Sequence, residues 1–191
     1  MTKAELKKAK YWVKRLKSLK KPDIKMIVFL FNSFHFRSAA EARKAGIVLK
    51  EFVSKHEGSF RRVYQVESLK LVVKFPQGSC GRYSGIEHTN EEIDTFERIS
   101  TYKKYKYLRH YLPKIYYYNR KTGVVLMKKY RLLDYKTAEL ASSILNKLAF
   151  DILGHSTDIY SSNVAVEYTK YGCPKVKIID LGYFSHHSDG S

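Results

Sequence analysis

The chain has 191 residues, 44% of them hydrophobic, so it is long enough to bury a core and its composition argues against global disorder. Its longest purely apolar run, residues 26–31, is too short to span a membrane, and its two cysteines are too few for a disulfide framework, so we expect a reduced, cytoplasmic protein. Lys and Arg number 36 against 18 Asp and Glu, and this net charge of +18 favours contact with nucleic acid, an anionic membrane or an acidic protein.

The first predicted element is a basic helix over residues 3–21, ended by Pro22. Its apolar residues recur at helical spacing, at Leu6, Ala9, Val13 and Leu16. Residues 1–21 hold nine Lys or Arg and one Glu, a net of +8. The segment either packs its apolar stripe on the main domain or serves as an arm for nucleic acid or an acidic protein surface.

The next segment, residues 24–34, is mostly apolar and fits a buried strand or a short core helix equally well. Ser38 and Glu41 form a capping box that predicts a short helix ending before Gly46. Three short runs rich in Val, Phe and Tyr follow at 47–53, 60–66 and 70–76, and they predict an antiparallel meander.

A helix is predicted over residues 89–100, opened by a second capping box of Thr89 with Glu92. Residues 114–118 and 124–130 flank a turn whose Gly123 can take positive φ, which predicts a hairpin. Residues 137–153 form a strongly periodic helix, with its apolar positions at Leu140, Ile144, Leu148 and Ile152. Two strands, at 163–168 and 175–180, complete the predicted elements.

In this order, four short motifs resemble those of the protein-kinase fold. "VVK" (72–74) is similar to the strand whose Lys holds the α- and β-phosphates, and "GSFRRVY" (58–64) is similar to the second half of the glycine-rich loop. "DIYSSN" (158–163) has the spacing of the catalytic loop, and "DLG" (180–182) is similar to the metal-binding Asp-Phe-Gly. His56 and Arg61 stand at two of the glycine positions. The match runs from about Val53 to Phe184.

A closer resemblance is to the short serine/threonine kinase-like proteins of tailed bacteriophages. Those proteins often show Gly-Ile-Glu-Gln-Asn-x-x-Glu before the helix and Asp-Ile-His-Ser-Gly-Asn in the loop. The corresponding stretches here are "GIEHTNEE" (85–92) and "DIYSSN", with Tyr160 and Ser162 at the His and Gly of the loop.

The resemblance implies an α+β, protein-kinase-like fold: an antiparallel N-lobe sheet with one helix, and a truncated helical C-lobe that contains the catalytic-loop hairpin. We expect residues 1–22 to be a basic N-terminal helix and 23–46 a connecting core segment with a capped helix. Residues 47–130 would form the N-lobe-like sheet with its helix, and 131–191 the truncated C-lobe. We also expect residues 1–45 to replace part of the helical lobe by packing beneath the helix near 140–152.

The resemblance also implies the chemistry, with ATP and Mg²⁺ as cofactors. Asp158 and Lys74 would be catalytic, Asp158 as the base for the attacking hydroxyl and Lys74 as the cation on the phosphates. Asn163 and Asp180 offer hard oxygen ligands for Mg²⁺. Further nucleotide-binding residues would be Gly58, Ser59, Met127 and Lys129, together with Glu92.

Two acidic residues compete to pair with Lys74. We favour Glu92 over Glu91, because Glu92 shares the apolar side of its helix with Phe96 and Ile99. The alternative for Glu92 is a purely structural role as the Glu of the Thr89 capping box.

The leading functional prediction is a minimal protein kinase that transfers the γ-phosphate of ATP to Ser/Thr hydroxyls of host proteins, in the host cytoplasm if a phage encodes it. One alternative is an inactive or nucleotide-binding pseudokinase that acts as a basic module for a host protein or nucleic acid. A small-molecule phosphotransferase is a third, less favoured possibility. Plain nucleic-acid binding through residues 1–21 is compatible with all three.

Overall fold

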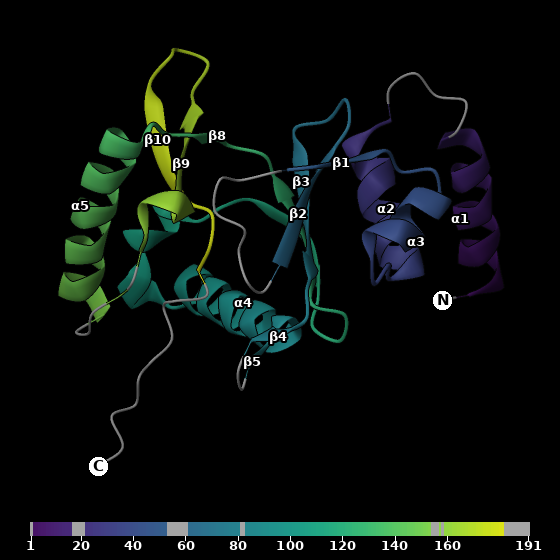
Figure 1. The fold of residues 1–191 in the computed structure, drawn as a ribbon, viewed down its shortest axis with the longest axis horizontal. Coiled ribbons are helices and arrows are strands. Elements are labelled where there is room, and N and C mark those ends of the chain that lie inside the picture. Colours follow the sequence, from purple (N-terminus) through teal and green to yellow (C-terminus); the bar gives the residue numbers. More distant parts are fainter. Residues whose placement is uncertain are drawn as a thin grey trace. The chain divides into compact units, whose positions relative to one another are not determined.

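The computed structural model describes residues 2–16, 22–52, 61–80, 83–153, 157 and 159–181 (Figure 1). The chain divides into two compact units, one of residues 1–89 with 114–129 and the other of residues 90–113 with 130–191. Both units contain α-helices and antiparallel sheet, so the fold is α+β, as predicted.

The first unit is built on a five-stranded antiparallel sheet in the order β1-β2-β3-β7-β6. Its strands are β1 (Leu49–Glu51), β2 (Arg61–Val66), β3 (Leu71–Pro76), β6 (Ile115–Asn119) and β7 (Val124–Lys128). The predicted meander and hairpin are both confirmed. The β6–β7 turn requires glycine: Gly123 has a φ of 64°, and an added Cβ would lie 3.0 Å from the Ile86 Cα atom.

Three helices precede this sheet: α1 (Lys3–Leu16), α2 (Ile24–Phe34) and α3 (Ala39–Lys44). The ambiguous apolar segment is therefore a helix, and Asp23 caps it by accepting from the Lys25 amide at 3.2 Å. Ser38 accepts from the Glu41 amide at 3.2 Å, as its capping box predicts. The Glu41 carboxylate accepts from the Arg37 amide at 2.7 Å, whereas a capping box would place this bond on the amide of Ser38.

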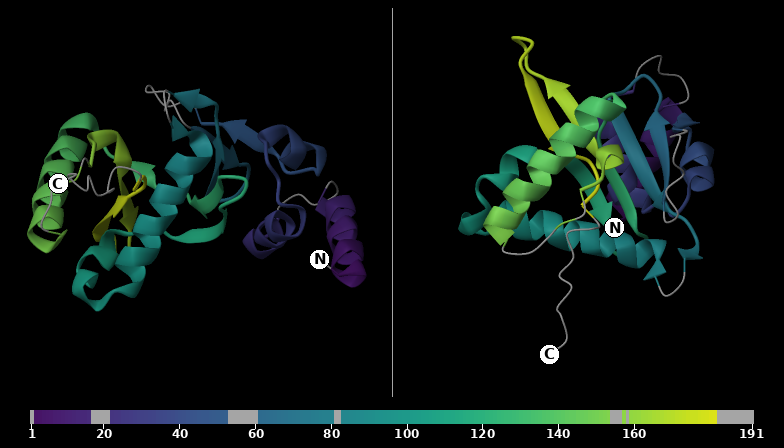
Figure 2. Two further views of the ribbon diagram at one scale, coloured as in Figure 1. Left: turned by 90° about the horizontal axis from the view of Figure 1, so that it is seen from below. Right: turned by 60° about the vertical axis from the view of Figure 1, so that its left-hand side comes forward.

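Helices α2 and α3 pack on the sheet of their own unit, and α1 packs on α2 (Figures 1 and 2). Phe31 of α2 lies with its ring centroid 6.4 Å from that of Phe75 and 5.8 Å from that of Tyr117. Ala42 and Leu16 belong to the same buried cluster. The expectation that residues 1–45 pack beneath the helix near 140–152 is therefore wrong, because their apolar side chains complete the core of the sheet instead.

Helix α4 (Gly85–Thr101) starts four residues earlier than predicted. It follows the short ladder of β4 (Ser79–Cys80) and β5 (Tyr83–Ser84). Its capping box is Ser84 with Glu87: the Ser84 hydroxyl accepts from the Glu87 amide at 3.2 Å, and the Glu87 carboxylate accepts from the Ser84 amide at 2.7 Å. The predicted Thr89 cap is wrong. Thr89 lies inside the helix, where its hydroxyl is 2.9 Å from the Gly85 carbonyl, its hydrogen-bond acceptor.

The second unit holds a three-stranded antiparallel sheet in the order β10-β9-β8 beside helix α5 (Figure 2). Its elements are the 3₁₀ turns η1 (Lys103–Tyr105), η2 (Leu108–Tyr111) and η3 (Ser161–Asn163), the strands β8 (Arg131–Leu132), β9 (Val164–Tyr168) and β10 (Pro174–Ile178), and α5 (Tyr135–Leu153). The core joins Leu145 and Ala149 of α5 to Val164, Ile178 and Leu181.

Helix α5 is present as predicted, but only two of its four predicted apolar positions, Leu148 and Ile152, pack against the core. Leu140 and Ile144 are 65% and 59% exposed, while Ala138, Ser142, Leu145 and Ala149 are buried. Mostly small side chains form the buried face, which lets the helix backbone come close to its neighbours. Within the described ranges, no helix has the length and apolar character needed to cross a membrane.

Candidate functional site

Lys74 lies on β3 with only 6% of its surface exposed. Its neighbours Val73 and Phe75 belong to the core cluster shared with the N-terminal helices. Because side chains alternate along a strand, Lys74 lies on the sheet face opposite those helices. Met127 lies on the same face, since Val72 pairs with Met127 and Lys74 pairs with Val125 across the ladder. The structure thus brings two predicted nucleotide-binding residues onto one sheet face.

Lys129 continues the same alternation just beyond β7. Its ammonium donates to the Gln65 Oε1 atom at 2.7 Å and lies 5.6 Å from the centroid of the Phe52 ring. Gln65 pairs with Val72 on the neighbouring strand, so it shares the face of Lys74. A lysine held in this way has a fixed position instead of the mobile one of an ordinary surface charge.

Arg61 is a residue of this face that the sequence analysis treated only as a missing glycine. It is two residues before Val63, which pairs with Lys74, so it shares the same side of the sheet. Only 7% of its surface is exposed. A guanidinium can bind a phosphate through two parallel hydrogen bonds, so this position can bind an anion with a side chain where glycine would use its backbone. In the sequence, the signal for such an anion-binding side chain is a basic residue at a position where glycine is expected.

Glu92 is completely buried, on the same side of α4 as Ile99, whereas Glu91 is half-buried. Glu92 does not cap its helix, because the capping box of α4 is made by Ser84 and Glu87. A carboxylate that is withdrawn from water requires charged or hydrogen-bonding partners.

Asn163 and Asp180 lie at the same end of the β9–β10 hairpin. Val164, which follows Asn163, pairs with Ile178, and the Ile179 amide donates to the Asn163 carbonyl at 2.7 Å. Asp180 is the next residue after Ile179, so the backbone fixes these two predicted metal ligands near one another. A carboxylate and an amide oxygen suit Mg²⁺, which keeps several waters or phosphate oxygens beside one or two protein ligands.

Asn146 of α5 is a second residue that the sequence analysis missed. Its Oδ1 atom accepts from the Thr157 hydroxyl and the Ile159 amide, both at 2.9 Å, and its Nδ2 atom donates to the Ile159 carbonyl at 3.0 Å. One side chain therefore fixes the residues on both sides of position 158. Nothing in the sequence singles out Asn146, because an Asn within a helix is usually a solvated polar residue.

Three predicted site residues, Gly58, Ser59 and Asp158, lie outside the described residues, as does His56. Of the positions that differ from the bacteriophage pattern, Tyr160 is 53% exposed. The Ser162 hydroxyl donates to the Asn163 Oδ1 atom at 3.4 Å. In the described part of the chain, no three His, Cys, Asp or Glu side chains come together as a metal centre would require.

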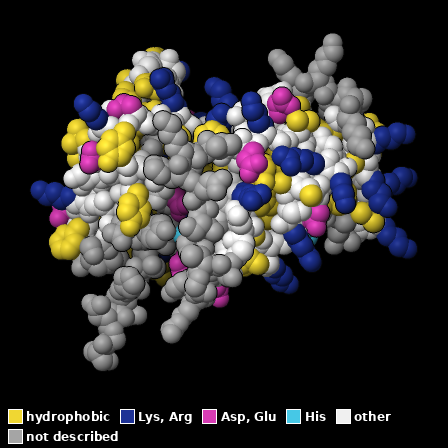
Figure 3. Space-filling model, in the orientation of Figure 1, with side chains coloured by type: hydrophobic (Ala, Val, Ile, Leu, Met, Phe, Trp, Pro, Cys, Tyr) yellow, Lys and Arg dark blue, Asp and Glu magenta, His cyan; other side chains and the backbone are white. Residues whose placement is uncertain are grey.

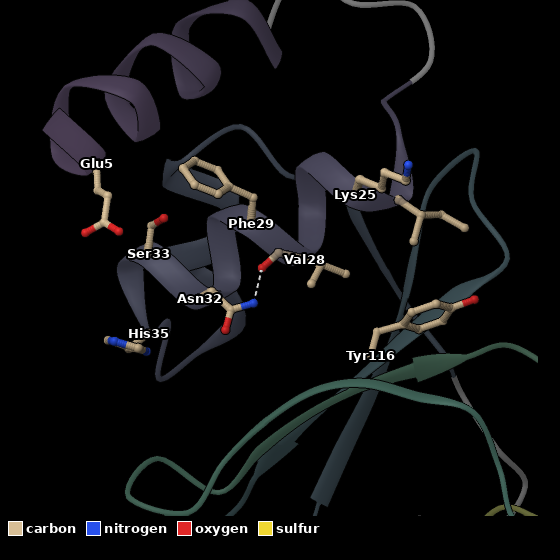
Figure 4. A pocket seen from close by; sticks show the side chains of 9 residues that line it. Glu5, Lys25, Val28, Phe29, Asn32, Ser33, His35 and Tyr116 are labelled. Carbon is tan, nitrogen blue, oxygen red and sulfur yellow. Dashed lines mark hydrogen bonds between the residues drawn. The ribbon is translucent and has the colours of Figure 1, made fainter. Parts of the chain in front are cut away.

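A separate groove of about 660 Å³ lies in the first unit between α1, α2 and β6 (Figure 4). Phe29 and Val28 form its apolar wall, Tyr116 lies across from them, and Glu5 and His35 lie toward the other end. None of the predicted site residues lines this groove.

Comparisons with known proteins give no family assignment. No protein-family model and no curated protein matches the chain. Among solved structures, the chain is similar to the Rio2 kinase from Chaetomium thermophilum, in a crystal structure of its ADP/Mg²⁺–phosphoaspartate complex. The identity is 12% and the TM-score 0.40, over 98% of this chain and 75% of that one.

Proposed function

We propose that this chain is an ATP- and Mg²⁺-dependent protein kinase of minimal size, acting on Ser/Thr hydroxyls of proteins. The observation that carries the proposal is the hairpin end in the second unit. There Asn163 and Asp180 are held near one another by the backbone, and Asn146 fixes the loop on both sides of position 158. Oxygen ligands beside a fixed loop are what phosphoryl transfer requires of a protein, since most of its catalysis is positioning and charge stabilisation.

Bound ATP with Mg²⁺ would supply the transferable γ-phosphoryl group. In the proposed site Asn163 and Asp180 would hold the metal, and Lys74, a nearly buried residue, would bind phosphate oxygens. Asp158 orients the substrate hydroxyl and accepts its proton. Gly58, Ser59, Met127 and Lys129 would bind the rest of the nucleotide.

Glu92 would pair with Lys74 and set the direction of its ammonium. The complete burial of Glu92 and the 6% exposure of Lys74 support this role, because both charges are costly to hold away from water unless each is compensated. The bacteriophage resemblance of residues 85–92 and 158–163 favours a host protein as the substrate and the host cytoplasm as the place of action.

A second candidate function is nucleotide binding without transfer, by a pseudokinase that acts through its partners. One observation favours it: Arg61 replaces a phosphate-loop glycine on the face of Lys74 and is nearly buried. A bulky cation at this place can hold phosphates tightly while it alters their position for transfer.

The experiment incubates the purified chain with γ-labelled ATP, Mg²⁺ and a host lysate. The variants Asp180→Ala and Lys74→Met are compared with the matched controls Asp151→Ala and Lys70→Met, whose side chains are exposed. Protein labelling that the first pair abolishes and the controls retain supports the kinase. If ATP raises the melting temperature and no protein is labelled, the pseudokinase is supported instead. Absence of both effects would contradict both candidates.

A further inference from the structure

Helix α1 carries a line of lysines along one face, the lysine stripe, formed by Lys3, Lys7, Lys10 and Lys14. All four side chains are exposed. At 100° per residue they fall within an arc of about 60°, and at 1.5 Å per residue they span about 16 Å. Figure 3 shows dark blue Lys and Arg side chains projecting from the edge of the molecule where Figure 1 places α1.

The opposite face of α1 anchors the helix to the first unit. Ala9 and Leu16 are buried, and Trp12 and Val13 pack against the core cluster. The apolar stripe and the lysine stripe therefore lie on different faces of α1. Packing of the helix on the first unit leaves the basic face exposed.

No acidic residue of α1 interrupts the lysine stripe. Glu5, the one acid of this helix, lies about 200° around the axis from Lys3. Its carboxylate accepts from the Thr2 amide at 2.8 Å, and this hydrogen bond is the main cause that lowers the pKa of Glu5. Arg15 is also kept off the stripe, because its guanidinium lies 5.3 Å from the centroid of the Trp12 ring.

An anionic membrane, an acidic protein or a nucleic acid could bind such a surface, and the geometry favours the nucleic acid. A membrane-bound helix inserts its apolar face, but that face of α1 is already packed in the core. An acidic protein presents carboxylates in an irregular pattern, which bidentate Arg recognises better than Lys. A nucleic acid presents phosphates at a regular spacing, and it is bound by evenly spaced point charges without a demand on their orientation.

We propose that the lysine stripe of α1 binds the sugar–phosphate backbone of a nucleic acid without reading its sequence. This inference is independent of the proposed kinase activity. Four phosphate contacts predict that the logarithm of affinity falls with the logarithm of salt concentration with a slope of about −3.6 for duplex DNA and about −2.8 for a single strand.

The test measures binding of the full chain by fluorescence anisotropy, from about 50 to 200 mM salt. The probes are labelled duplex DNA, duplex RNA and single-stranded DNA, with polyglutamate and vesicles containing anionic lipid as the alternative polyanions. The stripe variant changes Lys3, Lys7, Lys10 and Lys14 to Gln. The matched control changes four other exposed lysines to Gln, Lys121, Lys136, Lys147 and Lys175, and so removes the same charge.

The wild type and the control variant should bind nucleic acid alike. The stripe variant should have a slope shallower by about 3.6 on duplex DNA, equivalent to about 10²-fold in affinity over that salt range. Circular dichroism should show both variants folded. Equal slopes for the two variants would overturn the proposal. So would polyglutamate binding as tight as DNA, which would indicate an acidic protein partner, or binding to the vesicles alone.

Discussion

At the residue scale, the two buried charges Lys74 and Glu92 give the most direct test of the predicted ion pair. Glu92→Gln should lower the free energy of unfolding by about 3–5 kcal/mol, because it leaves a buried cation uncompensated. Lys74→Met should cost a similar amount, and the double variant should cost clearly less than the sum. Urea unfolding of the four proteins measures this cycle.

Glu91→Gln is the matched control for that cycle, since Glu91 is the half-buried neighbour of Glu92. It should show no coupling to Lys74→Met. Strictly additive effects of Glu92→Gln and Lys74→Met would mean that the two charges are compensated by other groups.

Asn146 makes a second residue-scale prediction, as a positioning residue for the proposed catalytic loop. Asn146→Ala removes three hydrogen bonds to Thr157 and Ile159, so kcat should fall by about 10²-fold while the KM for ATP changes little. Asn32→Ala is the control, because the Asn32 side chain donates to the Val28 carbonyl of its own helix. Steady-state kinetics well below the melting temperature measure both parameters. If the two variants lowered kcat and raised KM to the same extent, Asn146 would have no positioning role.

Tyr117 predicts a dependence of stability on pH. Burial raises the pKa of its phenol, with the Asn119 side chain opposing the rise. The neutral phenol is thus favoured in the folded state. Its contribution to the stability of that state is complete below the unfolded pKa of about 10. That contribution is lost as pH rises through the higher folded pKa. Above pH 10 the wild type should lose stability faster than Tyr117→Phe in urea unfolding, whereas Tyr135→Phe, at a 69% exposed position, should follow the wild type.

At the element scale, the orientation of α5 is a testable difference between sequence and structure. Changing Leu140 and Ile144 together to Gln should alter the unfolding free energy by less than about 1 kcal/mol, because both side chains are exposed. Leu145→Ala should cost about 2–5 kcal/mol, since Leu145 is 3% exposed in the core. Urea unfolding measures both. A large loss in the first variant and a small one in the second would restore the orientation predicted from the sequence.

Helices and strands that depend on residues close together in the sequence were predicted correctly. The meander, the β6–β7 hairpin and the long helix each follow from local pattern and turn chemistry. The start of α4 was misplaced because Thr89–Glu92 and Ser84–Glu87 both fit a capping box, and only the helix backbone distinguishes them. The orientation of α5 was misjudged because two of its large apolar residues, Leu140 and Ile144, are exposed, while the small residues Ala138, Ser142 and Ala149 are buried beside Leu145.

At the scale of the whole molecule, the sequence could not show which surface the N-terminal helices would cover. Their apolar stripes fit a sheet as well as a helix, and the choice depends on long-range packing of side chains such as Phe31 with Phe75. The motifs of the candidate site could be located in the sequence, since their order and spacing are local, and the roles of their residues stay a prediction. Arg61 and Asn146 were missed because their roles depend on strand pairing and on a contact between segments distant in the chain.

The proposed function depends on transfer of the γ-phosphoryl group of ATP to protein hydroxyls. The most direct measurement compares protein labelling from γ-labelled and from α-labelled ATP, for the wild type, Asp180→Ala and the exposed control Asp151→Ala. A kinase should give stable labelling of Ser or Thr from the γ-label only, lost in Asp180→Ala and kept in Asp151→Ala. Labelling from the α-label, or γ-labelling that survives Asp180→Ala, would contradict the proposed function.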